Sequence, residues 1–383
     1  METNVVTERL AFVRDLESGH WSMTELCERY GVTRPTGYKW LARHQAGGRA
    51  ALTDRSRAPQ QCPHRTDEAL ERLIIAARLE YGWGAKTLLH VLRSRHPSRS
   101  WPARSTVNAI LERHTLLHKN RRRRKWAHPG AAPVATQRPN QIWPADFNGQ
   151  FRTGDGQYCY PLTVTDHFSR RVLACHGLRS VKTVDAKPVF RSLFRAVGLP
   201  DAIRTDNGVP FASTGIHGLA ALNVWWMQLG IVHQRITPAS PQENGTHERM
   251  HRELKRETAR PAASSLRAQQ RRFDAFCARY NDERPHEGIG DRTPSTLWSP
   301  SPRRYPERVA PPDYPAHMEI RRVSTAGTFR LQSRQPFLSH ALDGQDIGLE
   351  EVADGIWNIV YYSTLLGKID ERTARITGIK PGP

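Results

Sequence analysis

Along the first 52 residues, apolar positions recur at the three- to four-residue spacing of an α-helix. This spacing predicts helices from Thr7 to Glu17 and from Met23 to Tyr30. A turn that ends at Thr33, a suitable N-cap, precedes a third and basic helix, in which Tyr38 and Leu41 are expected to face a core. Helix, turn and basic helix in this order predict a helix-turn-helix domain over residues 1–52.

The helical pattern returns after residues 53–65, a linker rich in proline and arginine. One helix, with Thr66 as its cap, is expected to run to about Glu80, WGAKTLLHVLRSR forms another, and Ser105 caps a third. These helices predict a second helix-turn-helix unit over residues 66–118. Residues 119–139 follow as a basic linker that contains KNRRRRK and a stretch rich in proline and alanine.

From residue 140 the pattern changes from helical to β. QIWPADFNGQF, QYCYPLTVTDHF and RRVLACHGL predict three successive strands joined by short turns. A helix capped by Ser180, a short strand ending at Thr205, a helix from Gly215 to Leu229, the strand IVHQRIT and the long helix NGTHERMHRELKRETA follow. This order predicts a mixed α/β domain over residues 140–300, and such domains carry their sites at strand ends and loops.

The last part of the chain is again rich in β signals. After a Pro/Arg linker at residues 301–317, short apolar segments separated by glycine turns predict a small β-barrel over residues 318–383.

The charge composition indicates what kind of partner the protein binds. The 383 residues include 57 Lys and Arg against 37 Asp and Glu, which gives a formal net charge of +20. Such an imbalance favours a polyanion, and nucleic acid is the commonest one. Five scattered cysteines, with no CxxC pair, indicate neither a disulfide framework nor a zinc cluster. No long apolar run and no secretory signal are present, so we expect a cytoplasmic protein.

The basic residues suggest two surfaces for DNA. In the first helix-turn-helix unit, four side chains are available for base edges and phosphates. They are Arg34, Thr36, Lys39 and Arg43. In the basic linker, Arg121, Arg122, Arg123 and Arg124 form a candidate phosphate-binding strap. The alternatives are an ordinary three-helix bundle with a basic surface and a solvated tether, respectively.

Three carboxylates stand out in the α/β domain. Asp146 lies in WPADF, although aspartate is depleted within strands, and Asp206 follows a short strand in RTDNG. Each has a simpler explanation, since Asp146 could face water on an edge strand and Asp206 could stabilise a turn. Glu248, on the long helix, is the third candidate. Glu243, in the loop before that helix, is the runner-up, and Asp166 is expected to hold a turn.

Helical geometry distinguishes Glu248 from the other glutamates of its helix. At about 100° per residue, Arg252 and Lys255 lie within roughly 40° of Glu248, so they share its face. Glu253 and Glu257 lie about 140° and 180° away. Arg252 and Lys255 are therefore placed to hold the phosphates of a bound strand, with a solvated helix face as the alternative.

The candidate donors are oxygen atoms, and the sequence shows no His/Cys cluster at ligand spacing. Such a donor set suits hard cations, Mg²⁺ or Mn²⁺. Two such ions about 3.5 to 4 Å apart support in-line phosphoryl transfer.

WPADF, RTDNG and NGTHERMHRELK together resemble the Asp-Asp-Glu integrase core of bacterial insertion-sequence transposases and retroviral integrases. The tandem helix-turn-helix front, NDERPHEGIGDRTP and the β-rich tail resemble more narrowly the insertion-sequence-481-type transposases. The resemblance implies an RNase H-like core with Asp146, Asp206 and Glu248 as catalytic metal ligands for two ions. One departure is that 42 residues separate Asp206 from Glu248, somewhat more than the family usually has, which keeps Glu243 in consideration.

The resemblance also implies an activity. A transposase of this kind binds the terminal repeats of its element, cleaves the element ends and joins them to target DNA. We therefore expect a nucleoid-associated bacterial protein, at least dimeric because two ends must be joined. The rivals are a DNA-binding regulator with an inactive core and a nuclease that cuts without joining.

Overall fold

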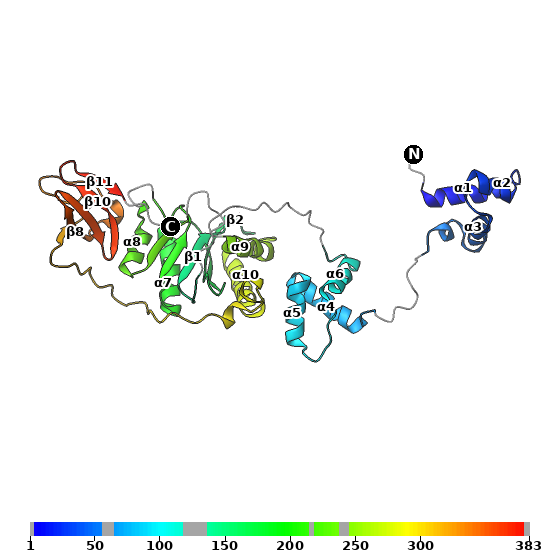
Figure 1. Cartoon of the computed structure of the whole chain (residues 1–383), viewed down its shortest axis with the longest axis horizontal. Coiled ribbons are helices and arrows are strands. Elements are labelled where there is room, and N and C mark those ends of the chain that lie inside the picture. The colour runs from blue at the N-terminus through cyan, green and yellow to red at the C-terminus, as the bar shows by residue number, and fades with distance from the viewer. Residues whose placement is uncertain (1–3, 56–64, 118–135, 214–217, 237–244, 379–383) are drawn as a thin grey trace. The chain divides into compact units, whose positions relative to one another are not determined.

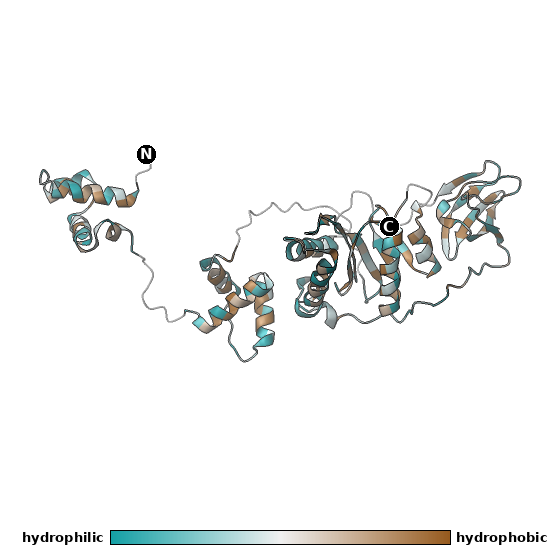
Figure 2. Ribbon diagram, turned by 180° about the vertical axis from the view of Figure 1, so that it is seen from behind, coloured by the Kyte–Doolittle hydropathy of each residue, from teal (hydrophilic) through white to brown (hydrophobic). Residues whose placement is uncertain are grey.

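The computed structural model describes residues 4–55, 65–117, 136–213, 218–236 and 245–378 (Figure 1). The chain divides into two compact units, Met1–Asp67 and Glu68–Pro383, which are described separately. Hydrophobic and hydrophilic residues are mixed along the helices of both units (Figure 2). No helix in the described ranges is long and apolar enough to cross a membrane.

The N-terminal unit is a three-helix domain. Its helices are α1 (Val5–Glu17), α2 (Met23–Arg29) and α3 (Arg34–Gly47). Leu41 packs against the core, as expected, but Tyr38 is 58% exposed, so that part of the prediction was wrong. The reason is Gly37, where α3 crosses so closely that a Cβ would lie 2.8 Å from Phe12 Cζ. Because Gly37 faces the core, Tyr38 is turned about 100° away from it.

A second three-helix domain opens the larger unit. It contains α4 (Glu68–Tyr81), α5 (Ala85–Arg95) and α6 (Arg104–Arg113) around a shared apolar core. The first of these helices begins two residues after Thr66. Ser105 does not cap α6 as predicted, because it lies inside the helix and Ala103 occupies the N-cap position without a side-chain bond.

The α/β domain is built on a mixed sheet. Its strands are β1 (Ile142–Phe147), β2 (Phe151–Arg152), β3 (Tyr158–Thr165), β4 (Val172–Leu178), β5 (Ala202–Thr205) and β6 (Val232–Arg235). The strand order is β2-β3-β1-β5-β6, and β4 also pairs with β3. Strands β1, β3 and β4 pair antiparallel, whereas β5 pairs parallel with both β1 and β6. The expected antiparallel strands followed by alternating elements are therefore present.

Helices cover the two faces of this sheet. One face packs α7 (Thr183–Val197) and α8 (Ala221–Gln228) on the buried side chains Trp143 and Ala145 of β1. The other packs α9 (Gly245–Thr258) and α10 (Leu266–Ala278) on β3 and β4. The sequence interpretation missed α10. Ser180 was expected to cap α7, but Lys182 holds that position, and Ser180 instead bonds the Asp185 carboxylate at 2.5 Å.

The C-terminal region is an open sheet, so the predicted β-barrel was wrong. Five strands form a meander in the order β11-β10-β9-β8-β7. They are β7 (Glu319–Arg322), β8 (Asp346–Ala353), β9 (Ile356–Tyr361), β10 (Thr364–Asp370) and β11 (Arg375–Gly378). Within the described residues, β7 and β11 do not pair with each other. The apolar face is buried instead against Leu219 and Val224 in and beside α8, so closure is not needed to cover it.

Candidate active site

Asp146 is directed by strand alternation to the α9 side of the sheet. Its neighbour Ala145 belongs to the core on the α7 side, and successive residues of a strand point to opposite faces. Asp146 pairs in register with Thr163 of the adjacent antiparallel strand β3. Because Asp146 sits in an internal strand, β1, between β3 and β5, the simpler explanation of a water-facing residue on an edge strand is wrong.

Asp206 follows β5 directly, and β5 runs parallel to β1. Parallel neighbours end at the same edge of a sheet, which brings the Asp206 and Asp146 regions together. The Asp206 carboxylate also accepts a hydrogen bond of 3.1 Å from the Gly208 backbone N–H. The turn-stabilising role is therefore present, and it leaves the other carboxylate oxygen available.

Glu248 projects from the first turn of α9 and is exposed. It lines a groove of about 780 Å³ together with Asn148, His251, Arg252 and Lys255. Glu253 and Glu257 are engaged elsewhere, as helical geometry predicted. Glu253 accepts a 2.6 Å bond from Arg284, and Glu257 accepts a 3.0 Å bond from Arg279.

The charges of the Asp206 and Glu248 carboxylates both act on Asp146, so each of them lies near Asp146. Burial raises the pKa of the Asp146 carboxyl to about 7, and the negative charges of Asp206 and Glu248 add to the rise. The positive charge of Lys255 opposes it. Burial and two nearby negative charges disfavour an ionised carboxylate, and either a proton or a bound cation removes this cost.

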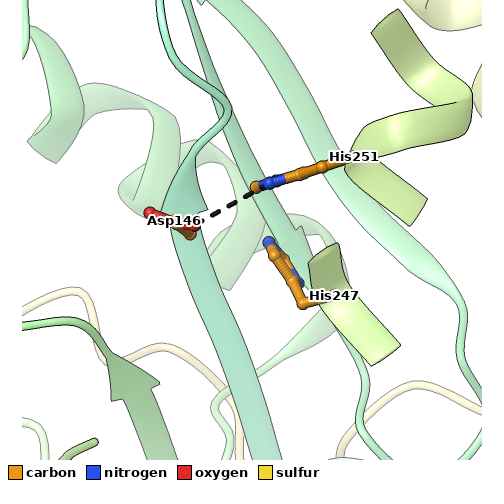
Figure 3. A group of neighbouring side chains, drawn as sticks. All are labelled: Asp146, His247 and His251. Carbon is orange, nitrogen blue, oxygen red and sulfur yellow. Dashed lines mark ion pairs between the residues drawn. The ribbon is translucent and has the colours of Figure 1, made fainter. Parts of the chain in front are cut away.

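Two histidines of α9 complete the site, and the sequence interpretation missed them. His247 and His251 are four residues apart, so both lie on the buried face of the helix. Together with Asp146 they form a group whose ligand atoms lie within 4.8 Å of one another. Figure 3 shows both imidazoles extending from α9 toward the strand that carries Asp146. The expectation that no histidine cluster occurs at ligand spacing was therefore wrong, and HERMH was the signal.

Threonine hydroxyls of β3 hold these imidazoles. The Thr163 hydroxyl lies 2.8 Å from His247 Nε2 and 2.6 Å from His251 Nε2. The Thr165 hydroxyl lies 2.9 Å from His247 Nδ1. Burial lowers the pKa of His251 to about 3 and lowers the pKa of His247 well below its ordinary value, so both rings are neutral near pH 7.

The cationic residues expected beside Glu248 are where helical geometry placed them. Arg252 and Lys255 are exposed and line the same groove. Lys255 reaches across to Gly149, where an added Cβ would lie 3.1 Å from the ammonium nitrogen. Asp166, by contrast, is buried and accepts bonds of 2.7 Å from Asn140 N–H and 2.8 Å from Ser169 N–H, so it holds a turn as expected.

The remaining predicted residues are spread over other parts of the chain. On α3, Arg34 and Lys39 are exposed, while Thr36 and Arg43 are half-buried. These four side chains are accessible, and their contact with DNA stays a prediction. Two other predictions, the arginine strap at residues 121–124 and the alternative ligand Glu243, lie outside the described residues.

Known protein families match both parts of the chain. The Integrase core domain family matches residues 136–241 and 229–294. A Helix-turn-helix domain family matches residues 8–60, and a Homeodomain-like domain family matches residues 36–111. The integrase-core matches cover the α/β domain with Asp146, Asp206 and Glu248.

Two insertion-element proteins are similar over long stretches. The chain is 28% identical to the insertion element IS476 uncharacterized 39.2 kDa protein of Xanthomonas euvesicatoria over 279 residues, 70% of this chain and 75% of that protein. It is 28% identical to the insertion element IS407 uncharacterized 31.7 kDa protein of Burkholderia multivorans over 180 residues, 45% of this chain and 58% of that protein.

Viral integrases are more distant neighbours. An intasome structure of simian T-cell lymphotropic virus with PP2A regulatory subunit B56 gamma matches at 19% identity and TM-score 0.38, covering 76% of this chain and 97% of that one. The catalytic core of HTLV-2 integrase in complex with magnesium, in its trimeric form, matches at 16% identity and TM-score 0.33, covering 43% and 99%.

Proposed function

We propose that the chain is an integrase-core polynucleotidyl transferase related to insertion-element transposases, and that it is a DNA transposase that cleaves the ends of its element and joins them to target DNA. The observation that supports this proposal is that the candidate carboxylates Asp206 and Glu248 both lie near Asp146, at the edge of the sheet where β1 and β5 end. The negative charges of Asp206 and Glu248 both raise the pKa of Asp146, although the three residues come from separate segments of the chain.

The donor set fits a divalent cation. Asp146, Asp206 and Glu248 supply carboxylate oxygens, which Mg²⁺ and Mn²⁺ prefer. Burial and the two neighbouring negative charges raise the pKa of Asp146, and a cation would offset both effects. These three residues would hold two ions. Such ions supply a nucleophile at neutral pH and neutralise charge on the leaving oxygen in phosphoryl transfer.

The chain's own residues position and orient the DNA strand. Asp146 is fixed by β-sheet pairing on both sides of β1, and α9 is fixed by hydrogen bonds from its histidines to β3. Arg252 and Lys255 hold the phosphates beside Glu248, where their cationic groups line the same groove. This arrangement lets an anionic backbone approach an acidic site.

The other domains supply recognition and assembly. The helix-turn-helix domains bind DNA, and we assign them the terminal repeats of the element, with α3 entering the major groove. The C-terminal sheet supports DNA binding or assembly. Because two element ends are joined in one reaction, the active form is at least a dimer, acting in the bacterial nucleoid.

The direct test is joining of a labelled duplex, taken from the ends of the DNA element that encodes the chain, to a supercoiled plasmid. We expect joined products with Mg²⁺ or Mn²⁺ and none with EDTA. Binding without cleavage in the presence of either metal would favour the regulator with an inactive core. Cleavage without joined products would favour a nuclease.

A further inference from the structure

The hydroxyl of Thr163 organises the buried face of α9. It is 3.1 Å from the backbone carbonyl oxygen of Asp146, and between a hydroxyl and a carbonyl only the hydroxyl can donate. A hydroxyl donates one hydrogen bond and accepts two, so all three contacts of Thr163 are hydrogen bonds when its single proton goes to Asp146. The two remaining contacts of Thr163, with the Nε2 atoms of His247 and His251, must then be donated by the imidazoles.

This assignment fixes the tautomer of both neutral rings. Each histidine carries its proton on Nε2, so each Nδ1 presents a lone pair. The lone pair of His247 accepts a bond from the Thr165 hydroxyl at 2.9 Å. Both ring nitrogens of His247 therefore have hydrogen-bond partners on β3.

His251 differs from His247 at this second nitrogen. Its Nδ1 lies 3.8 Å from Asp146 Oδ2, too far for a hydrogen bond (Figure 3). With the proton on Nε2, a lone pair faces a carboxylate, an arrangement that becomes favourable when a cation lies between them. His251 also lines the groove beside Glu248.

We propose that His251 Nδ1 is a ligand, beside Asp146, of the divalent ion that the carboxylates hold. The inference rests on the proposed function, because it assumes that the carboxylates bind a metal. Bonds of about 2.1 Å from a single ion can join two ligand atoms up to roughly 4.2 Å apart, so 3.8 Å is within reach. Thr163 orients the ring from its other nitrogen, which is the usual support of a metal-binding histidine.

The nitrogen ligand gives the site a preference among metals. Imidazole suits transition ions, whereas Mg²⁺ strongly prefers oxygen. Removing His251 should therefore weaken Mn²⁺ binding by about tenfold or more and change Mg²⁺ binding much less. A purely structural histidine would affect both ions equally.

The test is pulsed EPR of Mn²⁺ bound to the full chain, with no other ligand added. We expect a ¹⁴N coupling from a directly bound imidazole, replaced by a ¹⁵N coupling when the histidines are ¹⁵N-labelled. His251→Gln should remove the coupling. Thr165→Val is the matched control, because it removes a bond of His247 on the same face and should keep the coupling. The labelled native chain reports nitrogen ligation even if His251→Gln does not fold.

The outcomes separate this inference from the function beneath it. Mn²⁺ that is lost in Asp146→Asn but shows no nitrogen coupling in the native chain would overturn the role of His251 and leave the carboxylate site intact. That role is also overturned if His251→Gln folds and keeps the coupling. Mn²⁺ that does not bind, or binds equally well to Asp146→Asn, would overturn the proposed metal site as well.

Discussion

Helices α7 and α9 pack on opposite faces of the same sheet and have nearly equal lengths, 15 and 14 residues. Their buried faces differ in character. The face of α7 is wholly apolar and consists of Ala186, Val189, Phe190, Leu193 and Phe194. The face of α9 consists of His247, Met250, His251, Leu254 and Thr258. One helix is held by hydrophobic burial, and the other also by hydrogen bonds.

The difference concerns how a helix beside the candidate site is held in place. Burying a polar side chain costs free energy unless its hydrogen bonds are made, so α9 depends on the two threonines of β3. These directional hydrogen bonds fix both the orientation of α9 and its distance from β3. Glu248, which lines the same groove as His251, is thereby placed near Asp146 of the neighbouring strand. The buried face of α7 needs no hydrogen-bond partners, so we interpret α7 as a structural helix that covers the sheet.

The largest expected effect concerns charge at the sheet edge. Asp206→Asn should reduce DNA joining by at least about a thousandfold, because a metal ligand loses its charge. Asparagine can still accept the bond from Gly208 N–H, so the turn is preserved. The control is Asp201→Asn, just before the same strand, where the carboxylate pairs with Arg138. Equal joining activity of Asp206→Asn and native protein would mean that Asp206 only stabilises the turn and is not a metal ligand.

On α7 the large effect should fall on stability. Phe194 is fully buried, and Phe194→Ala should lower the free energy of unfolding by about 3–5 kcal/mol. Val184→Ala, at a position 72% exposed on the same helix, should change it by less than about 0.5 kcal/mol. Urea unfolding measures both. A loss of joining activity in Phe194→Ala protein that is still folded would contradict the architectural role.

Asp146 should give stability an unusual pH dependence. Its pKa is raised in the folded chain from 3.8 to about 7, so the folded state binds the extra proton between these values. The contribution of Asp146 to stability therefore falls as pH rises from about 4 to 7 and is constant above.

Buried histidines act in the opposite direction, because lowered pKa values make the folded chain less stable as pH falls below about 6.5. The measurement is therefore the difference in melting temperature between native protein and Asp146→Asn, without metal, from pH 5 to pH 8. The native protein should lose stability relative to the variant as pH rises. A flat difference would mean that Asp146 is not perturbed.

The smallest effect is expected on the open face of α9. Lys255→Ala should weaken binding of the element-end duplex by roughly tenfold and reduce the slope of log affinity against log salt by about one, as for one lost phosphate contact. Arg271→Ala, exposed on α10, is the control and should change little. A Lys255→Ala slope equal to the native slope would place the DNA elsewhere.

Periodicity predicted the architecture well because most elements bury one apolar stripe. The strands of the sheet, α7 and α9 follow from such patterns, and helical geometry alone separated Glu248 from Glu253 and Glu257. It failed at Tyr38, where the close approach of Gly37 decided the face of the helix. The open C-terminal sheet was missed because its cover comes from α8, about a hundred residues earlier in the chain.

The site was predictable only in part, for a similar reason. The three candidate carboxylates follow from their positions in or after strands and on one helix face, and their role stays a prediction. His247 and His251 occupy core positions of α9, and a helix pattern read for apolar residues passes over them. Their meaning appears only when Thr163 and Thr165 of β3 are placed opposite, a pairing that depends on tertiary structure.

The assigned carboxylate site is tested most directly by strand joining with Mg²⁺, using native protein, Glu248→Gln and Glu243→Gln. All three proteins should bind the labelled element-end duplex alike, since each substitution replaces one carboxylate by an amide of nearly the same size. We expect joined products from native protein and Glu243→Gln, and a loss of at least about a thousandfold in Glu248→Gln. Joining that survives in Glu248→Gln and disappears in Glu243→Gln would contradict the assignment of Glu248.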